Sequence, residues 1–178
     1  MLLAKHYAEQ SKYAKEIKEF TEITIPSLSQ SQILAMDECS FRLNEAPRFG
    51  YSEKGSKAVR RRPGKRGSNH TLVLCVTNVG EKGVVHYELI EKGIKTKSFH
   101  EFLTKLNLPA DEKHYLLLDN LPVHKATDSC RKLKLSTIRE LLTSKNIEPI
   151  YLPSYTPQLN PVELCFNNIR HNIEKSRS

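Results

Sequence analysis

The stretch YLLLDNLPVHKA, residues 115–126, places an aspartate directly behind four apolar or aromatic residues. A run such as Tyr115–Leu118 is typical of a strand that is buried on both faces of an α/β sheet. Ligands collect beyond the carboxyl ends of strands in open α/β sheets, so Asp119 stands where a reacting group would stand. The alternative is that Asp119 only caps the turn Asp-Asn-Leu-Pro by accepting backbone N–H bonds. The rest of the sequence has to decide between these two interpretations.

Two other segments also bring acidic residues to an element boundary. The apolar segment ILAM, residues 33–36, runs into Asp37 and Glu38, and we predict a strand that ends at these carboxylates. The segment beginning NPVEL predicts a helix with Asn160 as N-cap and a proline in the first helical position, so that Glu163 lies in its first turn. If the two strands lie side by side, Asp37, Asp119 and Glu163 converge on one place.

The remaining pattern indicates an α/β protein with a mixed sheet. TLVLCVTNV and VVHYELI are separated by the turn GEKG and read as a hairpin. Amphipathic helices are predicted over residues 96–108 and over 136–146 with a serine cap, and a short strand over 147–153. The first 20 residues predict a helix, which a connector at TIPSLSQSQ ends. We therefore expect a linker helix and connector in residues 1–30 and one folded domain in residues 31–178.

Composition restricts the class of protein further. The chain has 178 residues and a formal charge of +8, with a sequence pI near 9.3, which favours a polyanionic partner such as nucleic acid. Its four cysteines are widely spaced, so neither a zinc site nor a disulfide framework is expected. No apolar stretch approaches the roughly 20 residues that span a bilayer. We expect an intracellular protein, in a bacterial cytoplasm or a nucleus, without a membrane or small-molecule partner.

Converging carboxylates indicate a metal site. Carboxylates without basic partners repel one another, and such groups are commonly held together by divalent cations. Oxygen-only ligation favours Mg²⁺ or Mn²⁺ over Zn²⁺. Two such ions can activate an attacking hydroxyl and stabilise the leaving oxygen of a phosphoryl displacement. The predicted chemistry is the cutting or joining of phosphodiesters.

Three motifs, AMDECSF, LLLDNLPVHKA and YLPSYTPQLNPVELCFNNI, resemble the catalytic domain of DDE transposases of the mariner-like superfamily, particularly its bacterial insertion-sequence branch. The resemblance extends from about Ile33 to about Ile173. It implies an RNase H-like, retroviral-integrase-like fold, in which a mixed five-stranded sheet carries helices on both faces. It also implies that Asp37, Asp119 and Glu163 bind two Mg²⁺ or Mn²⁺ ions. Such enzymes hydrolyse DNA at transposon ends and then attack target DNA with the freed 3′-OH.

Four further polar residues within the motifs are expected to support the metal ligands. Glu38 either supports a ligand or faces solvent. His124 lies near the DNA backbone or a water on the metal, or it is a hydrogen-bonded structural histidine. Asn120 follows the family pattern, and Asn160 caps the last helix and so orients Glu163.

A basic loop is the predicted DNA contact. Its cations lie between residues 57 and 66 and would track phosphates: Lys57, Arg60, Arg61, Arg62, Lys65 and Arg66. The alternative is a solvated surface loop or a nuclear import signal. In the family, an insertion at this position contacts DNA or a partner subunit, but the tryptophan that relatives often carry there is missing here.

The resemblance also leads us to expect a double-stranded DNA partner and a homodimer, because two transposon ends must be brought together. The helix-turn-helix region that recognises the ends in family members is not expected in residues 1–30. Two alternatives to an active transposase domain stay open. One is a domesticated, non-catalytic module that binds DNA or a partner; the other is a different RNase H-like nuclease, such as a junction resolvase or an RNA-hybrid nuclease.

Overall fold

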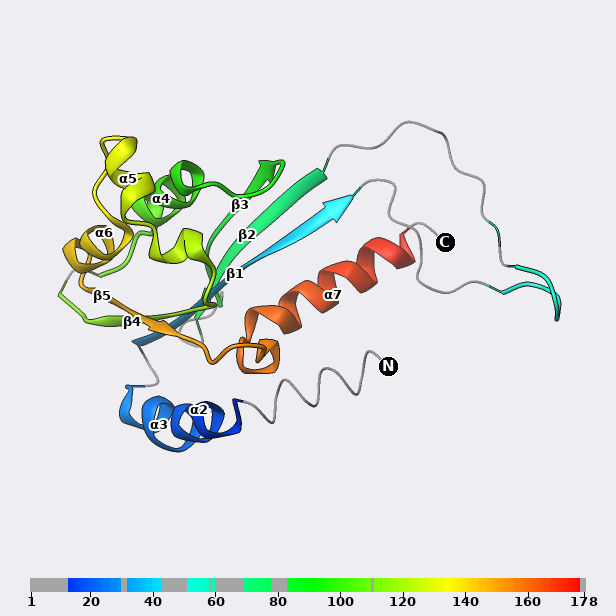
Figure 1. The fold of residues 1–178 in the computed structure, drawn as a ribbon, viewed down its shortest axis with the longest axis horizontal. Coiled ribbons are helices and arrows are strands. Elements are labelled where there is room, and N and C mark those ends of the chain that lie inside the picture. Colours follow the sequence, from blue (N-terminus) through cyan, green and yellow to red (C-terminus); the bar gives the residue numbers. More distant parts are fainter. Residues whose placement is uncertain are drawn as a thin grey trace.

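The structure, a computed structural model, describes residues 13–29, 32–42, 51–57, 59, 69–77, 83–109 and 111–176. Its centre is one five-stranded sheet in the order β3-β2-β1-β4-β5 (Figure 1). The strands are β1 (Ile33–Arg42), β2 (Asn69–Thr77), β3 (Val84–Glu91), β4 (His114–Leu118) and β5 (Ile147–Tyr151). The first three strands pair antiparallel, while β4 runs parallel to both β1 and β5. This arrangement confirms the predicted mixed sheet and the predicted hairpin.

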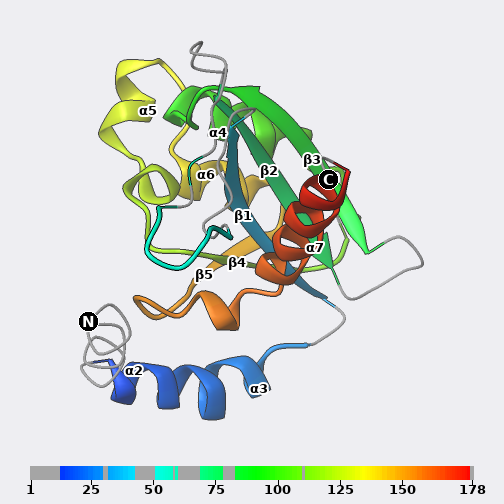
Figure 2. The same cartoon turned by 90° about the vertical axis from the view of Figure 1, so that its right-hand side faces the viewer.

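Helices cover both faces of the sheet, as predicted (Figures 1 and 2). One face carries α4 (Thr96–Lys105), α5 (Asp128–Lys132) and α6 (Ile138–Ser144), and α7 (Val162–Lys175) crosses the other. The apolar side chains form two clusters, one on each side of the sheet. Leu34 and Met36 of β1 belong to the α4 side, whereas Ala35 and Cys39 belong to the α7 side. Each face of β1 is therefore buried, which is why its sequence is apolar without alternation.

The strand β1 corrects the prediction that it ends at the carboxylates. It runs on through Asp37 and Glu38 to Arg42, because β2 pairs with it over nine positions from Leu34 to Arg42. Side chains alternate between the faces of a strand. Asp37 therefore lies on the face of Ala35, Cys39 and α7, and Glu38 lies on the face of Met36 and α4.

The N-terminal segment also differs from its prediction. Helical turns extend from α2 (Ala14–Glu19) through a π-helical turn (Phe20–Thr24) to α3 (Ile25–Ser27), so the helix continues through Pro26. A proline clashes with the carbonyl four residues before it in a straight α-helix, and a wider π-turn just before it relieves that clash. Phe20 is buried in the cluster on the α7 side. This segment thus packs onto the domain.

Three smaller differences concern helix ends and a missed helix. Thr137, and not the expected Ser136, caps α6 and forms a capping box with Glu140. The last helix begins at Val162, and Pro161 already has helical dihedral angles. The short helix α5 was not predicted. Across the described residues, no helix combines the length and the apolar character needed to cross a membrane.

Candidate active site

The sheet register brings Asp37 and Asp119 together. In the parallel pair β1 and β4, Ala35 lies opposite Leu117. Two residues further along, on the same face of each strand, are Asp37 and Asp119. The predicted meeting of these two carboxylates therefore follows from the pairing of two buried strands, one of which continues while the other ends.

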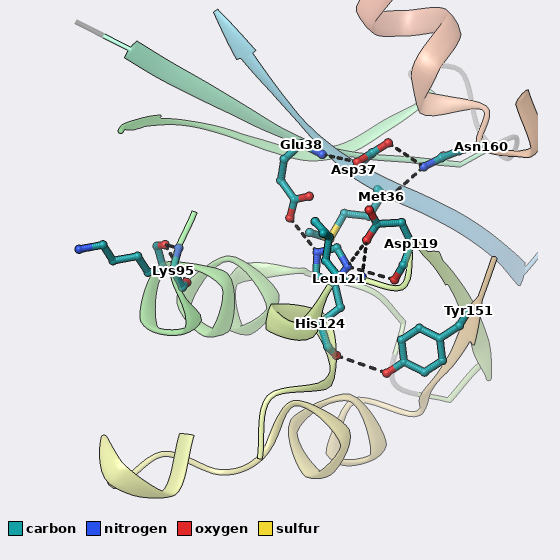
Figure 3. A network of polar contacts seen from close by, with 10 residues as sticks. Met36, Asp37, Glu38, Lys95, Asp119, Leu121, His124, Tyr151 and Asn160 are labelled. Carbon is teal, nitrogen blue, oxygen red and sulfur yellow. Dashed lines mark hydrogen bonds and ion pairs between the residues drawn. The ribbon is translucent and has the colours of Figure 1, made fainter. Parts of the chain in front are cut away.

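Asp37 is held by neutral hydrogen-bond donors. Its Oδ1 accepts the backbone N–H of Glu38 at 2.7 Å, and its Oδ2 accepts the side-chain amide of Asn160 at 3.1 Å (Figure 3). Burial raises the pKa of this carboxyl to about 7, against the lowering effect of the Glu38 N–H, and the nearby carboxylates add to the increase: Glu38, Asp119 and Glu163. Asp37 thus lies in a locally acidic environment in which a bound cation would stabilise its charged form.

Asp119 belongs to a chain of charged groups. His124 Nδ1 lies 2.7 Å from Asp119 Oδ1, and His124 Nε2 lies 2.9 Å from Glu38 Oε1 (Figure 3). The backbone N–H of Leu121 also donates to Asp119 Oδ1, at 3.1 Å. The imidazole of His124 has no exposed surface, and the Glu38 side chain is only 7% exposed. The Glu38 side chain therefore does not face solvent.

The charges in this chain stabilise one another. Burial alone would lower the pKa of His124, but its hydrogen bonds to Asp119 and Glu38 and their negative charges raise it to about 10. Burial alone would likewise raise the pKa of Asp119, but the hydrogen bonds from His124 and Leu121 hold it below its usual range. His124 is therefore a buried, hydrogen-bonded cation. Asp119 also accepts a backbone N–H in the turn, which is the contact expected from the alternative interpretation as a turn cap.

The start of α7 is anchored to β1 through Asn160. Its side-chain amide donates to the carbonyl of Met36 at 3.3 Å as well as to Asp37, and its Oδ1 accepts the backbone N–H of Val162 at 3.2 Å. Asn160 is 2% exposed. The predicted helix cap is thus also a bridge to the metal-site candidate. Glu163, in the first turn of α7, is partly buried and close enough to raise the pKa of Asp37.

Asn120 ties the ends of two parallel strands together. Its side-chain amide donates to the carbonyl of Leu152, directly after β5, and its Oδ1 accepts a hydrogen bond from Lys125. The ammonium of Lys125 also lies 4.2 Å from the centre of the Tyr151 ring. The side chain of Asn120 therefore connects the loop that follows Asp119 to the end of β5.

Sequence reasoning missed Arg170. This residue follows Glu163 by seven positions, which is about two turns of α7 and therefore the same side of the helix. Its Nη2 lies 2.8 Å from the Sγ of Cys39, two residues after Asp37 on the same face of β1. A cation therefore borders the acidic residues. The helical spacing from Glu163 is the signal that could have found it.

The predicted basic loop is mostly outside the described residues. Lys57 is described and exposed, whereas Arg60, Arg61, Arg62, Lys65 and Arg66 lie outside the described part of the chain. A groove of about 640 Å³ borders the loop after Asp119 on the α4 side, and its walls are partly basic and hydroxylated: Lys95, Thr96, Lys125, Thr127 and Ser129. Asp128 also lines it.

The donors around Asp37 fit a hard divalent cation in kind. They are carboxylates, and the buried one has its charge disfavoured in the absence of a cation. Within the described ranges, no group of three or more histidine, cysteine, aspartate or glutamate side chains is already arranged to hold a metal ion. Side-chain rotation or oxygen atoms from a substrate would have to complete a coordination shell.

The family follows from a comparison of the whole sequence. The profile of the DDE superfamily endonucleases matches residues 32–178 of the 178-residue chain. The chain therefore belongs to this family, as the three motifs predicted. A search of the curated proteins gave no match.

Solved structures with a similar fold include complexes of Mos1 transposase. The Mos1 strand transfer complex has a TM-score of 0.67 and 23% identity over 92% of this chain and 48% of that one. The mariner Mos1 paired-end complex with Mg has a TM-score of 0.66 and 23% identity over 92% and 49% of the two chains. The Mos1 mariner paired-end complex with Mn has a TM-score of 0.63 and 22% identity over 88% of this chain and 46% of that one. These matches show the RNase H-like fold, and the chain spans about half the length of the Mos1 chains.

Proposed function

We propose that this chain is the catalytic domain of a transposase, which cleaves DNA phosphodiesters and joins a 3′-OH end to target DNA. Membership of the DDE superfamily endonucleases supports the reaction class. The observation that carries the proposal is the position of Asp37, half-buried on the α7 face beside Asp119, with Glu163 near enough to raise its pKa. Burial and nearby carboxylates disfavour the charge on Asp37, and a bound cation would offset this cost.

Asp37, Asp119 and Glu163 are the proposed ligands of two Mg²⁺ or Mn²⁺ ions. Similar solved structures include one complex with Mg and one with Mn. When bound, the ions would supply activation of the attacking oxygen and stabilisation of charge on the leaving oxygen. Phosphate oxygens of the DNA would complete the coordination shell.

The protein's own residues hold the ligands in place. Asn160 connects the first turn of α7 to Asp37, so that Glu163 and Asp37 move as one unit. Arg170 lies on the Glu163 side of α7, where it would neutralise a DNA phosphate beside the acidic site. The buried strands β1 and β4 exclude water from the side of the site that faces the core.

Double-stranded DNA is the proposed substrate, with transposon ends and target as its two forms. The similar Mos1 structures include a paired-end complex with the left transposon end. The charge of +8 would favour association with DNA and make it sensitive to salt. Because two ends have to be processed together, we propose a homodimer in the DNA-bound state. Light scattering of the chain with and without duplex DNA would measure this.

The test is cleavage of supercoiled plasmid by the full chain in Mn²⁺ or Mg²⁺, followed by transfer of a 3′-OH oligonucleotide into plasmid. The variants are Asp119→Ala and Glu163→Ala, and the matched control is Asp111→Ala, which removes an exposed carboxylate on the loop before β4. We expect nicking and joining in the wild type and in Asp111→Ala, and neither in the other two variants or with a chelator.

Nicking that persists in Asp119→Ala, or that does not depend on a divalent ion, would contradict the proposed site. Nicking without joining, with a preference for branched DNA or RNA–DNA hybrids, would favour another RNase H-like nuclease. DNA binding with neither reaction would favour a non-catalytic binding module.

A further inference from the structure

His124 connects two carboxylates that come from different strands and different faces of the sheet. Glu38 lies on the α4 face of β1, while Asp119 follows β4 on the face of Leu117. The imidazole reaches both, with Nε2 at 2.9 Å from Glu38 Oε1 and Nδ1 at 2.7 Å from Asp119 Oδ1 (Figure 3). Such an arrangement links the middle of β1 to the end of β4 through side chains alone.

The ring of His124 is fixed by its surroundings. Its backbone N–H donates to the carbonyl of Leu121 at 3.0 Å, and its own carbonyl accepts the hydroxyl of Tyr151 at 3.3 Å. The ring of Phe99 lies 4.6 Å away from the imidazole, centre to centre. With no exposed surface and contacts on several sides, the imidazole has one available orientation. A ring held in this way can impose its orientation on a neighbour.

The contacts are selective for one oxygen of Asp119. Both the His124 ring and the Leu121 N–H address Oδ1. An ionised carboxylate only accepts, so a hydrogen on the facing imidazole nitrogen would complete each of these contacts. The hydrogen bonds and the ion pair made to the Asp119 carboxyl within the described ranges all end on Oδ1, and Oδ2 is the oxygen left for another ligand.

We propose that Glu38 and His124 are positioning residues that clamp Asp119 through Oδ1 and present its Oδ2 to a divalent cation. The inference rests on the proposed function, because the cation is the one assigned to the carboxylate site. It gives Asp119 a single ligating oxygen. It also accounts for a glutamate directly after Asp37, because the side chain of residue 38 points to the face of β1 on which His124 lies.

A purely structural role for Glu38 fits its environment less well. Its Oε2 is buried and has no hydrogen-bond partner within the described part of the chain. A buried unpartnered oxygen costs stability, and an apolar side chain would avoid that cost. Retaining a carboxylate here is reasonable if its other oxygen orients the histidine. Residues that orient a metal ligand in this manner typically change metal affinity about 10–100-fold when they are mutated.

The test compares Mn²⁺ affinity by calorimetry in the full chain and in four variants. Glu38→Ala removes one end of the clamp, and His124→Phe keeps a ring against Phe99 but has no N–H groups. Glu38→Gln keeps an oxygen that can accept from Nε2. The matched control is Phe102→Leu. Phe102 is a fully buried residue of α4 in the same apolar cluster as Phe99, but its ring packs on His86 and not on His124.

We expect Glu38→Ala and His124→Phe to weaken Mn²⁺ binding about 10–100-fold. Glu38→Gln should restore most of the affinity, and Phe102→Leu should leave it within about twofold at a comparable loss of Tm. An affinity of Glu38→Ala equal to that of the wild type would overturn the proposal. So would an equal loss in Phe102→Leu, since the effect would then follow general stability.

A readout without metal separates this proposal from the proposed function. In ¹⁵N-labelled protein at pH 7, His124 should show two protected ring N–H signals, identified by their disappearance in His124→Phe. Absence of either signal would overturn the clamp, whether or not the chain binds Mn²⁺. Both signals in a wild-type chain that binds no Mn²⁺, even with DNA present, would overturn the metal site and support the hydrogen-bonded clamp.

Discussion

Asp37 and Asp119 are neighbours on parallel strands, yet their environments differ. Asp37 lies within a continuing strand, and a backbone N–H and a neutral amide donate to it. Asp119 lies at the end of its strand and pairs with a buried histidine. Burial and neighbouring carboxylates raise the pKa of Asp37 to about 7, whereas His124 helps hold the pKa of Asp119 below its usual range. Asp119 is thus charged at neutral pH, whereas Asp37 is only partly charged there.

This difference assigns separate tasks to two side chains of the same type. Asp119 offers a permanent charge in a fixed orientation. At the proposed metal site, Asp37 would couple its ionisation to metal binding, because a bound cation would lower its pKa from about 7. The comparison can be tested by experiments that affect the two residues together or in opposite directions.

The largest effect is expected when either carboxylate is removed. Asp37→Ala and Asp119→Ala should each reduce DNA cleavage by about 10³-fold or more, because transition-state stabilisation of several kcal/mol is lost with the ions. Initial rates of plasmid nicking at saturating Mn²⁺ measure this. Should only one of the two variants lose activity, the two carboxylates would not belong to one site.

The pH dependence of metal affinity should come from Asp37. Its carboxyl must lose a proton to bind a cation, so Mn²⁺ affinity should be flat above about pH 7 and fall towards tenfold per pH unit below it. Asp119 keeps its charge over this range. Calorimetry at pH 6, 7 and 8 would show the change, and equal affinities at pH 6 and 8 would contradict the assignment.

Without metal, neutralising the two residues should change stability in opposite directions. The folded-state pKa of Asp37, about 7, lies above the ordinary aspartate value of 3.8, so the stability contributed by its protonated form is lost as the pH rises towards 7. At pH 8, Asp37→Asn should therefore stabilise the metal-free chain by about 1–2 kcal/mol. Asp119→Ala removes one of the two carboxylates that pair with His124 and should destabilise the chain by about 1–2 kcal/mol. Urea unfolding in chelator measures both, and a shared sign would refute the contrast.

A smaller effect is expected at Asn160, whose side-chain amide contacts Asp37 as the imidazole of His124 contacts Asp119. Asn160→Ala removes the amide from Asp37 and the acceptor from Val162, at a cost of about 1 kcal/mol. Asn168→Ala, on the exposed side of α7, is the matched control and should be neutral. Thermal unfolding of the two variants makes the comparison. An equal loss of thermal stability at both positions would mean that the hydrogen bonds from Asn160 to β1 do not stabilise the chain.

The sequence predicted the elements that carry the candidate site because their signals are local. A four-residue apolar run before Asp119 and an Asn-Pro start before Glu163 each identify one element and its end. The prediction of β1 was wrong about its end, since Asp37 and Glu38 look like a strand terminus and only the nine-position pairing with β2 shows otherwise. Pairing between distant segments leaves no mark in a local pattern.

The role of Glu38 depended on that missing information. Its face of the sheet follows from the continuation of β1, and its partner His124 lies 86 positions further along the chain. The Asn120 hydrogen bond to Leu152 and the Arg170 contact with Cys39 likewise join residues from separate elements. Motifs pointed to the candidate residues of the site, whereas the contacts between these residues could be seen only in the fold.

The most direct test of the central claim is Mn²⁺ binding to the full chain, measured by calorimetry and located by anomalous scattering in crystals soaked with the ion. We predict an ion between Asp37, Asp119 and Glu163 that disappears in Asp119→Ala and persists in Asp111→Ala. No ion at these carboxylates at millimolar Mn²⁺, with duplex DNA present to supply phosphate oxygens, would contradict the account.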